Sequence, residues 1–478
     1  MDINKAQKFI DSLWDTSITP ELEKYIENPC KSPNFDKNWE ENKFLDKATQ
    51  QLVNWVKSQK INNLEIEIVN LQKRTPLIFI EIQKSNNSKS DETILLYGHM
   101  DKQPEFTGWD ADKSPWKPVI QDNKLYGRGG ADDGYAVFSA ISAIKAIQEQ
   151  DLPHSRCVII IEGCEESGSF DLPYYIDHLK NKIGTPSLII CLDSGCGNYD
   201  QLWLTSSLRG VINLKLSVSS IKEGVHSGFA SGIVPSSFRI ARMLLSRIED
   251  ENTAEIKPKF LHTTIDQYFV KEIKKCADIL KNKVYSELPW SYNKQNNSLA
   301  KPVSNNNFEL LLNRTWKPTL SIVGADDIPE ISSAGNVLRP RSTLLLSFRI
   351  PPKVDSKKAA IKLKELLEKE PPYNSNIEVE ITSAGDGWHA PILSDFLKNL
   401  VNESSELTFD KPSVIWGEGG TIPFMAMLGE KFPEAEFVIT GVLGPKSNAH
   451  GPNEFLHIPY AKKITCSVAN IIYKYALK

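Results

Sequence analysis

Long apolar segments are missing from this 478-residue sequence. No uninterrupted apolar run approaches the roughly 20 residues that a helix needs to cross a bilayer. The opening residues, MDINKAQKFIDSLWD, are polar and amphipathic and contain no apolar core of the signal-peptide type. We therefore expect a cytoplasmic protein that does not act at a membrane.

An excess of charge of either sign is also missing. The chain carries 56 Lys and Arg residues against 60 Asp and Glu residues, a formal net charge of -4. Such a balance gives no basic surface for nucleic acid, and we expect no nucleic-acid partner. An apolar fraction of 40% and a charged fraction of 24% are typical of a protein with a well-packed core.

Cysteine pairs with metal-binding spacing are absent as well. The cysteines number seven, and no two of them stand in a CxxC arrangement. An odd set without such pairs favours buried free thiols in a reducing compartment over a disulfide framework or a thiolate metal site.

The length exceeds that of one ordinary domain, and the pattern changes along the chain. Up to residue 204, apolar strands alternate with helices, which predicts an α/β domain with a mostly parallel sheet and helices on both faces. Residues 205–384 contain half-exposed strands and amphipathic helices and predict a separate α+β domain inserted into the first. Glycine-rich turns return in residues 385–478, which we assign to the second part of the first domain.

The most informative stretch is residues 94–135. An apolar strand at 94–97 leads through Gly98 to His99 and Asp101, which project to the same side of the backbone. The glycine-rich turn GRGGADDG then precedes an apolar helix at 136–147. Asp132 thus lies near a helix start, where the helix dipole favours a carboxylate.

Two further buried strands end in acidic residues. Glu165 and Glu166 follow the strand at 157–161, and Asp193 follows the strand at 187–192. Since sites of open α/β sheets lie at the carboxyl ends of strands, we expect these side chains to meet those of the first strand.

These residues have the chemistry of a metal site. Imidazoles and carboxylates without a thiolate suit Zn²⁺, Mn²⁺ or Co²⁺. The set exceeds the needs of one tetrahedral ion, and two ions about 3.5–4 Å apart that share one carboxylate would use it economically. Adjacent ionised glutamates repel, so we expect one of them to bind metal and the other to hold a proton. The candidates are His99, Asp132, Glu165, Glu166, Asp193 and His450.

A family resemblance extends over nearly the whole chain. The segments GHMD, GRGGADDG, EGCEESGS, CLDSG, VHSG and NAHGPNE together resemble the M20 family of dinuclear metallopeptidases. In the inserted domain, RTWKPTLSIVG and NVLRPRSTLLLSFRIPP are similar to the lid of its carnosinase and cytosolic non-specific dipeptidase branch.

The resemblance implies a role for each candidate ligand. Asp132 would bridge two divalent ions, with Zn²⁺ favoured and Mn²⁺ or Co²⁺ as alternatives. It also implies a cis peptide between Asp132 and Asp133. Glu165 would be the general base, and Asp101 would orient His99 from behind. The remaining ligands would be His99 and Asp193 for one ion, and Glu166 and His450 for the other.

The resemblance further implies substrate-binding residues and a homodimer formed through the lid. His226 would reach the active site of the other subunit, Asn336 and Arg349 would hold the carbonyl oxygen and carboxylate of the substrate, and Thr421 would belong to a glycine-rich substrate loop.

Three departures from the family pattern bear on substrate choice. The usual Asp-Asp-Lys-Gly reads Asp132-Asp133-Gly134-Tyr135, Gly417 replaces an arginine frequent in the dipeptidase branch, and Arg339 stands where a proline is usual.

The implied activity is metal-dependent hydrolysis of the peptide bond in dipeptides or short peptides with a free C-terminal carboxylate. Glu165 would activate the attacking water. An N-acyl-amino-acid deacylase on the same scaffold is the alternative enzyme, and a non-catalytic binding protein that has kept the fold is the alternative from another class.

Overall fold

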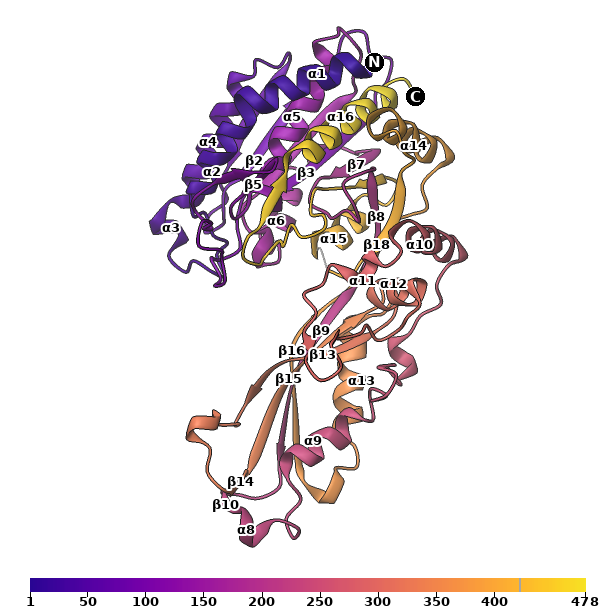
Figure 1. Ribbon diagram of the computed structural model, residues 1–478. Coiled ribbons are helices and arrows are strands. Elements are labelled where there is room, and N and C mark those ends of the chain that lie inside the picture. Colours follow the sequence, from indigo (N-terminus) through magenta and orange to yellow (C-terminus); the bar gives the residue numbers. More distant parts are fainter. Residues whose placement is uncertain (421–422) are drawn as a thin grey trace. The chain divides into compact units, whose positions relative to one another are not determined.

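The computed structural model describes residues 1–420 and 423–478, and the chain forms two compact units (Figure 1). Residues 1–206, 390–416 and 427–478 make the first unit, and residues 207–389 with 417–426 make the second. The second unit therefore includes a short segment beyond the predicted lid boundary. The assignment of these parts as catalytic and lid domains stays a prediction.

A six-stranded sheet forms the centre of the first unit. Its strand order is β1-β2-β6-β3-β7-β19, and β6, β3, β7 and β19 run parallel, whereas β1 and β2 form an antiparallel pair at one edge. The predicted mostly parallel sheet is confirmed. The bounds are β1 Leu64–Val69, β2 Leu77–Ile82, β3 Thr93–His99, β6 Arg156–Glu162, β7 Leu188–Cys191 and β19 Glu436–Ile439.

Helices cover both faces of this sheet. Strands β6 and β7 lie on opposite sides of β3, so the crossover from β3 to β6 and the crossover from β6 to β7 run in opposite directions. Because such crossovers are right-handed, the helices within them lie on opposite faces. Burial of both faces explains why these strands are continuous apolar runs. The crossover helices are α5 (Tyr135–Gln148), then α6 (Leu172–His178) and α7 (Lys180–Ile183).

Helix α5 is buried almost completely, with 12 of its 14 residues inside. Small side chains along it allow close packing against α1 (Ile3–Leu13) and α16 (Ile458–Tyr475), which lie beside it in Figure 1. The hydroxyls of Ser139 and Thr465 are 2.8 Å apart in this interface, so the buried polar groups satisfy one another. The other helices and short strands of this unit are α2 Thr19–Glu27, α3 Trp39–Asn42, α4 Phe44–Ser58, α14 Asp395–Phe409, β4 Val119–Gln121, β5 Lys124–Tyr126 and β20 Phe455–His457.

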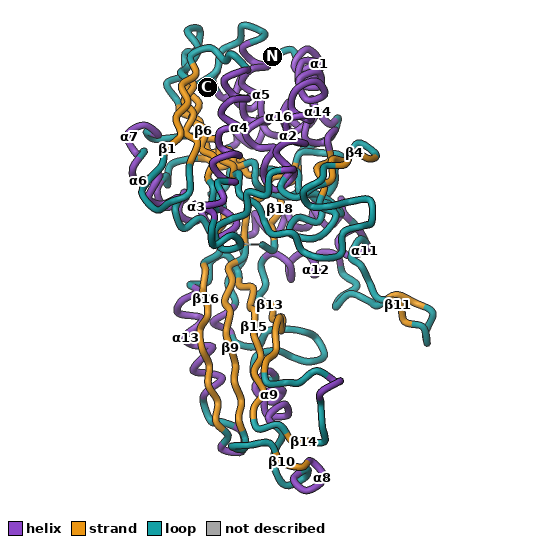
Figure 2. The backbone as a smooth tube through the Cα atoms, turned by 90° about the vertical axis from the view of Figure 1, so that its left-hand side faces the viewer, coloured by secondary structure: helices purple, strands orange, loops and turns teal. Residues whose placement is uncertain are grey.

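The second unit is built on a four-stranded antiparallel sheet, and Figure 2 shows its strands side by side. The strands are β13 (Thr319–Asp326), β15 (Arg341–Ile350), β9 (Gly210–Ser219) and β16 (Asn376–Gly385), in that order. Alternate residues of β9 and β15 form an apolar core with α9 (Ser237–Leu245) and α13 (Ser356–Glu368). The predicted α+β character is confirmed.

Shorter elements complete the second unit. They are β10 Val225–His226, α8 Ser227–Ala230, α10 Gln267–Leu280, α11 Lys283–Ser286, β11 Tyr292–Asn293, β12 Ser298–Leu299, α12 Asn307–Thr315, β14 Val337–Leu338 and β17 Trp388–His389. The chain passes between units within β8 (Trp203–Leu208), β18 (Val414–Glu418) and α15 (Pro423–Lys431). Within the described residues, none of the helices has the length and apolar character to cross a bilayer.

Candidate active site

The carboxyl ends of β3 and β7 bring the first candidate ligand group together. His99 is the last residue of β3, and Asp193 follows the neighbouring parallel strand by two residues. Asp132 comes from the turn that precedes α5. The His99 Nε2 atom lies 3.3 Å from Asp132 Oδ1 and 3.7 Å from Asp193 Oδ2. All three side chains are buried, so the group forms a preformed three-ligand position.

A second group shares Asp132 with the first. The His450 Nε2 atom lies 3.0 Å from Asp132 Oδ2 and 3.3 Å from Glu166 Oε2. Asp132 thus offers one carboxylate oxygen to each histidine. Within each group the ligand atoms lie within 4.8 Å of one another. Two three-ligand positions that share one carboxylate are the arrangement of a dinuclear site.

The donor set fits a pair of divalent ions. Imidazole nitrogens and carboxylate oxygens are ligands for Zn²⁺ and neighbouring transition metals. In addition, the Glu166 Oε1 atom is buried and has no hydrogen-bond partner, although the other oxygen of this carboxylate accepts a 2.5 Å hydrogen bond from Gln103 Nε2. A buried unsatisfied carboxylate oxygen is costly unless a cation compensates it.

The carboxylates of the cluster lie close enough together that their negative charges disfavour one another's ionisation. Burial and then the charge of Asp193 raise the pKa of Glu165 well above its ordinary value. Burial and then the charge of Asp132 raise the pKa of Glu166 in the same way. Burial also raises the pKa of Asp132, but hydrogen bonds with His450 and His99 outweigh it and lower that pKa. Divalent cations would favour the ionised form of all these carboxyls.

His99 is held by Asp101 from behind. Burial lowers the pKa of His99, but the charge of Asp193 and hydrogen bonds with Asp101 and Asp132 raise it well above its ordinary value. The His99 Nδ1 atom is 3.1 Å from the Asp101 carbonyl oxygen and 3.5 Å from Asp101 Oδ1. A hydrogen bond at Nδ1 fixes the ring and leaves Nε2 to face the ligand group.

The Asp101 carboxylate also fixes the turn that carries both glutamates. Its oxygens accept hydrogen bonds from the backbone N–H groups of Glu165 and Glu166, each at 3.0 Å. The turn, Glu165–Ser167, follows β6 after two residues. Asp101 therefore links the first histidine to the acidic turn, which adds a second contact to the orienting role predicted from the sequence.

Glu165 lies beside the ligand groups without belonging to either. Its Oε2 atom is 3.9 Å from His99 Nε2, and its side chain is 12% exposed. The carboxylate therefore has access to solvent next to both candidate metal positions. A carboxylate in such a place is available to exchange protons.

Comparison with known proteins identifies the family. The model of Peptidase family M20/M25/M40 matches residues 95–474. The chain belongs to this family. The predicted family and the predicted hydrolase class are both confirmed.

Two curated relatives show how far the similarity extends. The Cysteinylglycine-S-conjugate dipeptidase of Corynebacterium striatum is 25% identical over 386 residues, which cover 77% of this chain and 79% of that protein. The Cys-Gly metallodipeptidase DUG1 of Saccharomyces cerevisiae is 25% identical over 396 residues, which cover 79% and 78% of the two chains.

Solved structures share the fold. Human carnosine dipeptidase 1 superposes with a TM-score of 0.74 over the full length of both chains at 19% identity. The di-peptidase Dug1p of Saccharomyces cerevisiae superposes with the same TM-score at 20% identity, over 100% of this chain and 99% of that one. These two similarities show that the whole chain shares the fold of both structures.

The structure accounts for the departure from the family pattern at Gly134. The Asp132-Asp133 peptide is cis, as the resemblance implies. A Cβ atom on Gly134 would lie 2.3 Å from Tyr25 Cε1 and 2.6 Å from the Gly129 carbonyl oxygen. The family lysine therefore does not fit here. The Tyr25 ring, which leaves no room for a side chain at Gly134, is contacted by the buried ammonium of Lys102, whose Nζ lies 3.9 Å from the ring centre.

A buried ion pair near the site was not foreseen from the sequence. Arg128 Nη1 donates to Glu454 Oε2 at 2.6 Å, and the two side chains are 1% and 0% exposed. Both residues stand in motifs that carry the family resemblance, but 326 residues separate them. No local pattern predicts a pair at that separation. Gln103, which contacts Glu166, was missed for the same reason.

The predicted substrate residues that the structure describes lie in the second unit. The His226 Nδ1 atom accepts a hydrogen bond from Gly228 N at 3.1 Å, and the Asn336 carbonyl accepts one from Ser227 N at 2.8 Å, so the structure brings these two loops together. Arg349 lies on β15, half-buried on the face opposite the core. Thr421 lies outside the described residues.

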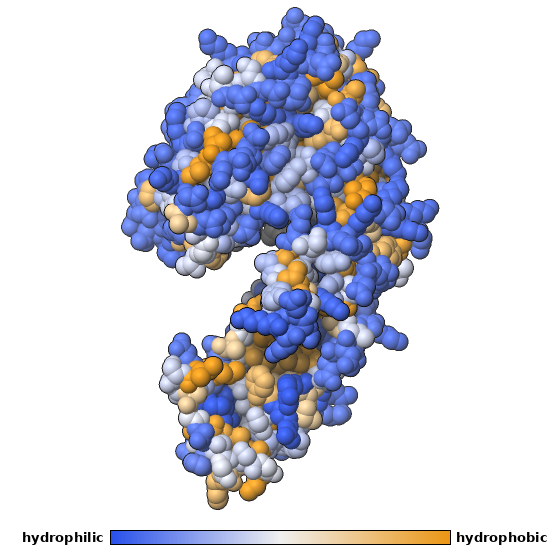
Figure 3. Space-filling view, viewed as in Figure 1, coloured by the Kyte–Doolittle hydropathy of each residue, from blue (hydrophilic) through white to orange (hydrophobic). Residues whose placement is uncertain are grey.

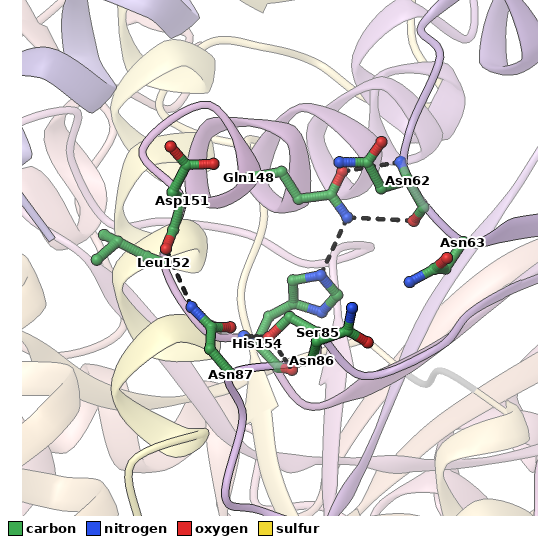
Figure 4. A pocket seen from close by; sticks show the side chains of 9 residues that line it. All are labelled: Asn62, Asn63, Ser85, Asn86, Asn87, Gln148, Asp151, Leu152 and His154. Carbon is green, nitrogen blue, oxygen red and sulfur yellow. Dashed lines mark hydrogen bonds between the residues drawn. The ribbon is translucent and has the colours of Figure 1, made fainter.

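A polar cavity of about 400 Å³ in the first unit is a structural junction (Figure 4). Gln148 there bonds with the backbone N–H and carbonyl of Asn62 and with His154 Nε2. His154 Nδ1 in turn lies 2.9 Å from the Ser155 carbonyl oxygen. These hydrogen bonds join the loops that line the cavity and satisfy the buried polar groups that they connect.

Proposed function

We propose that this chain is a dinuclear metallodipeptidase that hydrolyses the peptide bond of dipeptides or short peptides with a free C-terminal carboxylate. The observation that carries the proposal is the pair of three-ligand groups that share Asp132, with Glu165 beside them. Both curated relatives are named as dipeptidases with cysteinylglycine-type substrates, which supports a dipeptide as the substrate class.

Zn²⁺ is the proposed native ion, with Mn²⁺ and Co²⁺ as alternatives, because the ligands are imidazoles and carboxylates. His99 and Asp193 would hold one ion, Glu166 and His450 the other, and Asp132 both. When bound, such ions polarise a carbonyl oxygen and lower the pKa of a coordinated water toward neutrality.

Glu165 is the proposed general base. Its carboxylate takes a proton from the water that attacks the substrate carbonyl and then delivers that proton to the leaving amine. Asp101 supports this step indirectly, because it holds the backbone of Glu165 and the ring of His99 in fixed positions.

Arg349 is the proposed partner of the substrate carboxylate, since a planar guanidinium can bind a carboxylate through two parallel hydrogen bonds. Asn336 is the proposed donor to the substrate carbonyl, and Thr421 the proposed contact from the glycine-rich loop. His226 would stabilise the negative charge that develops on the carbonyl oxygen.

The sheet of the second unit supports a homodimer. Arg349 pairs with Val211 near one end of the strands, and Ser219, eight residues further along β9, precedes the β10 strand that carries His226. Eight residues span roughly 26 Å of strand, far more than a dipeptide can bridge. If His226 and Arg349 serve one substrate, they must therefore come from different copies of the chain.

Exposed apolar side chains on the same unit also support a homodimer. Phe229 is 80% exposed, Ile233 78% and Ile331 96%. Figure 3 shows apolar side chains among polar ones on the surface of this unit, in the lower part of the view. A second copy of the chain is the proposed occupant of this surface.

A cytoplasmic location is proposed as well. All seven cysteines are free and buried, in keeping with a reducing compartment.

The test compares hydrolysis of Cys-Gly, β-Ala-His and an N-acetyl amino acid by the wild-type protein and the Glu165→Gln variant. We expect dipeptide cleavage by the wild type and a loss of kcat of at least about 10²–10⁴-fold in the variant, with bound metal unchanged. Cleavage of the N-acetyl amino acid alone would identify a deacylase. Metal binding without any hydrolysis would identify a binding protein.

A further inference from the structure

The two ligand groups are anchored to the fold in different ways. His99 ends a fully buried strand, and its side chain is 0% exposed. His450 instead lies in the segment between β19 and β20, and its side chain is 55% exposed. Its own φ of 65° is left-handed, as are those of Asn448 and Asn453. Because non-glycine residues rarely adopt this conformation, other contacts must hold the segment in place.

The buried pair of Arg128 and Glu454 supplies such contacts. Besides its ion pair, Glu454 accepts hydrogen bonds from the backbone N–H groups of Gly129 at 3.0 Å and Asp132 at 3.4 Å. Arg128 Nη2 donates to the carbonyl of Gly451, the residue after His450, at 2.8 Å. The pair therefore joins the turn that carries Asp132 to the segment that carries His450.

We propose that the Arg128–Glu454 pair is a positioning clamp that sets the affinity of one metal position, Asp132–Glu166–His450, more than that of the other. Neither residue belongs to a ligand group, so the pair acts through the spacing between His450 and Asp132. This inference rests on the proposed dinuclear site. A ligand on a segment that must be ordered loses affinity when the ordering contacts are removed, whereas strand-held ligands keep theirs.

The geometry also shows what would remain without the clamp. The segment keeps other ties, among them those from Asp110 N to Asn453 Oδ1 at 2.9 Å and from Gly127 N to the Glu454 carbonyl at 3.0 Å. Loss of the ion pair should therefore loosen the segment without detaching it. The first position, His99–Asp132–Asp193, keeps its two strand-end ligands unchanged.

The experiment measures Mn²⁺ bound per chain against free Mn²⁺ by equilibrium dialysis, with the spin-coupled signal of paired ions followed by electron paramagnetic resonance. The variants are Glu454→Gln and the double change Arg128→Met with Glu454→Leu. The double variant leaves no unpaired buried charge, whereas a change to one partner alone would leave the other charge without its counterion. The matched control is Arg156→Met, which breaks an ion pair with Glu81 (2.6 Å) at the opposite end of β6.

We expect one ion per chain to bind as in the wild type, and the dissociation constant of the second to rise about 10–100-fold, with loss of the coupled signal. The control should retain both ions. Equal loss of affinity for both ions, or failure of both clamp variants to fold by circular dichroism, would overturn the proposal, because the pair would then be an element of general stability. Unchanged affinity for both ions would overturn it as well. If the wild type binds no metal, the proposed function fails together with the clamp. If the wild type binds two ions and the variants behave like it, only the clamp fails.

Discussion

Asp132 shows how much of the site depends on one side chain. Its two carboxylate oxygens lie 3.3 Å and 3.0 Å from the Nε2 atoms of two histidines that come from distant parts of the chain. Glycine at position 98 leaves room for the start of α5 beside this turn, because a Cβ atom there would lie 2.5 Å from the Cβ of Ala136. The glycine of the GHMD pattern is therefore needed for close packing, and the histidine is the candidate ligand.

Lys102 gives a prediction about pH at the residue scale. Its buried ammonium donates to the carbonyls of Tyr25 at 2.7 Å and Asn28 at 2.9 Å, at the C-terminal end of α2, and burial lowers its pKa from 10.5 to about 8. The unfolded state therefore binds more protons than the folded state between these values, so the contribution of Lys102 to stability rises as pH increases from about 8 to 10.5.

The Lys102→Met variant tests this in urea titrations at several pH values. The buried carbonyls of Tyr25 and Asn28 lose their donor in this variant, so we expect its free energy of unfolding to fall by about 2–4 kcal/mol. The gap between the wild type and the variant should widen with rising pH over that window. A gap that stays constant or narrows would contradict the assignment of the lowered pKa to Lys102.

At the scale of elements, the strongest sequence patterns gave the right strands. The apolar run predicted at 94–97 lies within β3, and the run predicted at 157–161 lies within β6. Because these strands are buried on both faces, they are short continuous apolar runs and show no alternation of apolar and polar residues. The helix predicted at 136–147 is α5, which begins one residue earlier and ends one residue later.

Other elements could not be predicted from local sequence patterns. One residue separates α6 from α7, and α2 follows α1 through a π-helical segment, Trp14–Ile18. The short strands β8 and β18 were not foreseen, because their pairing depends on residues about 200 positions apart in the sequence. The candidate ligands were predictable from their motifs, whereas the Arg128–Glu454 contact depends on the folded chain.

The core of the second unit gives a prediction at this scale. Leu346 lies on β15, and its side chain is fully buried among the residues of the apolar core. We expect Leu346→Ala to lower the free energy of unfolding of this unit by about 2–5 kcal/mol, and metal content to stay unchanged, because every candidate ligand lies in the first unit. Ile322, half-exposed on β13, is the matched control, and Ile322→Ala should cost less than about 0.5 kcal/mol. Loss of metal in the Leu346 variant would contradict this separation of roles.

At the scale of the whole molecule, the proposed role of His226 in the site of the other subunit requires two copies of the chain. A heterodimer purified with two different tags, one chain carrying Glu165→Gln and the other His226→Ala, would test it. If His226 acts across the dimer, one site has both an intact Glu165 and an intact His226, and the heterodimer should show about half of the wild-type activity. The corresponding variant homodimers should be nearly inactive.

An inactive heterodimer would place His226 and Glu165 in the same chain's site. Failure to isolate any heterodimer, with a monomeric mass in light scattering, would contradict the proposed assembly.

The number of ions bound per chain decides whether the site is dinuclear. After chelation and reloading with Zn²⁺, we predict two ions per chain and restored peptidase activity, and Asp132→Ala should lose both ions because its carboxylate belongs to both groups. One ion per chain with full activity, or activity that survives complete chelation, would contradict the dinuclear account.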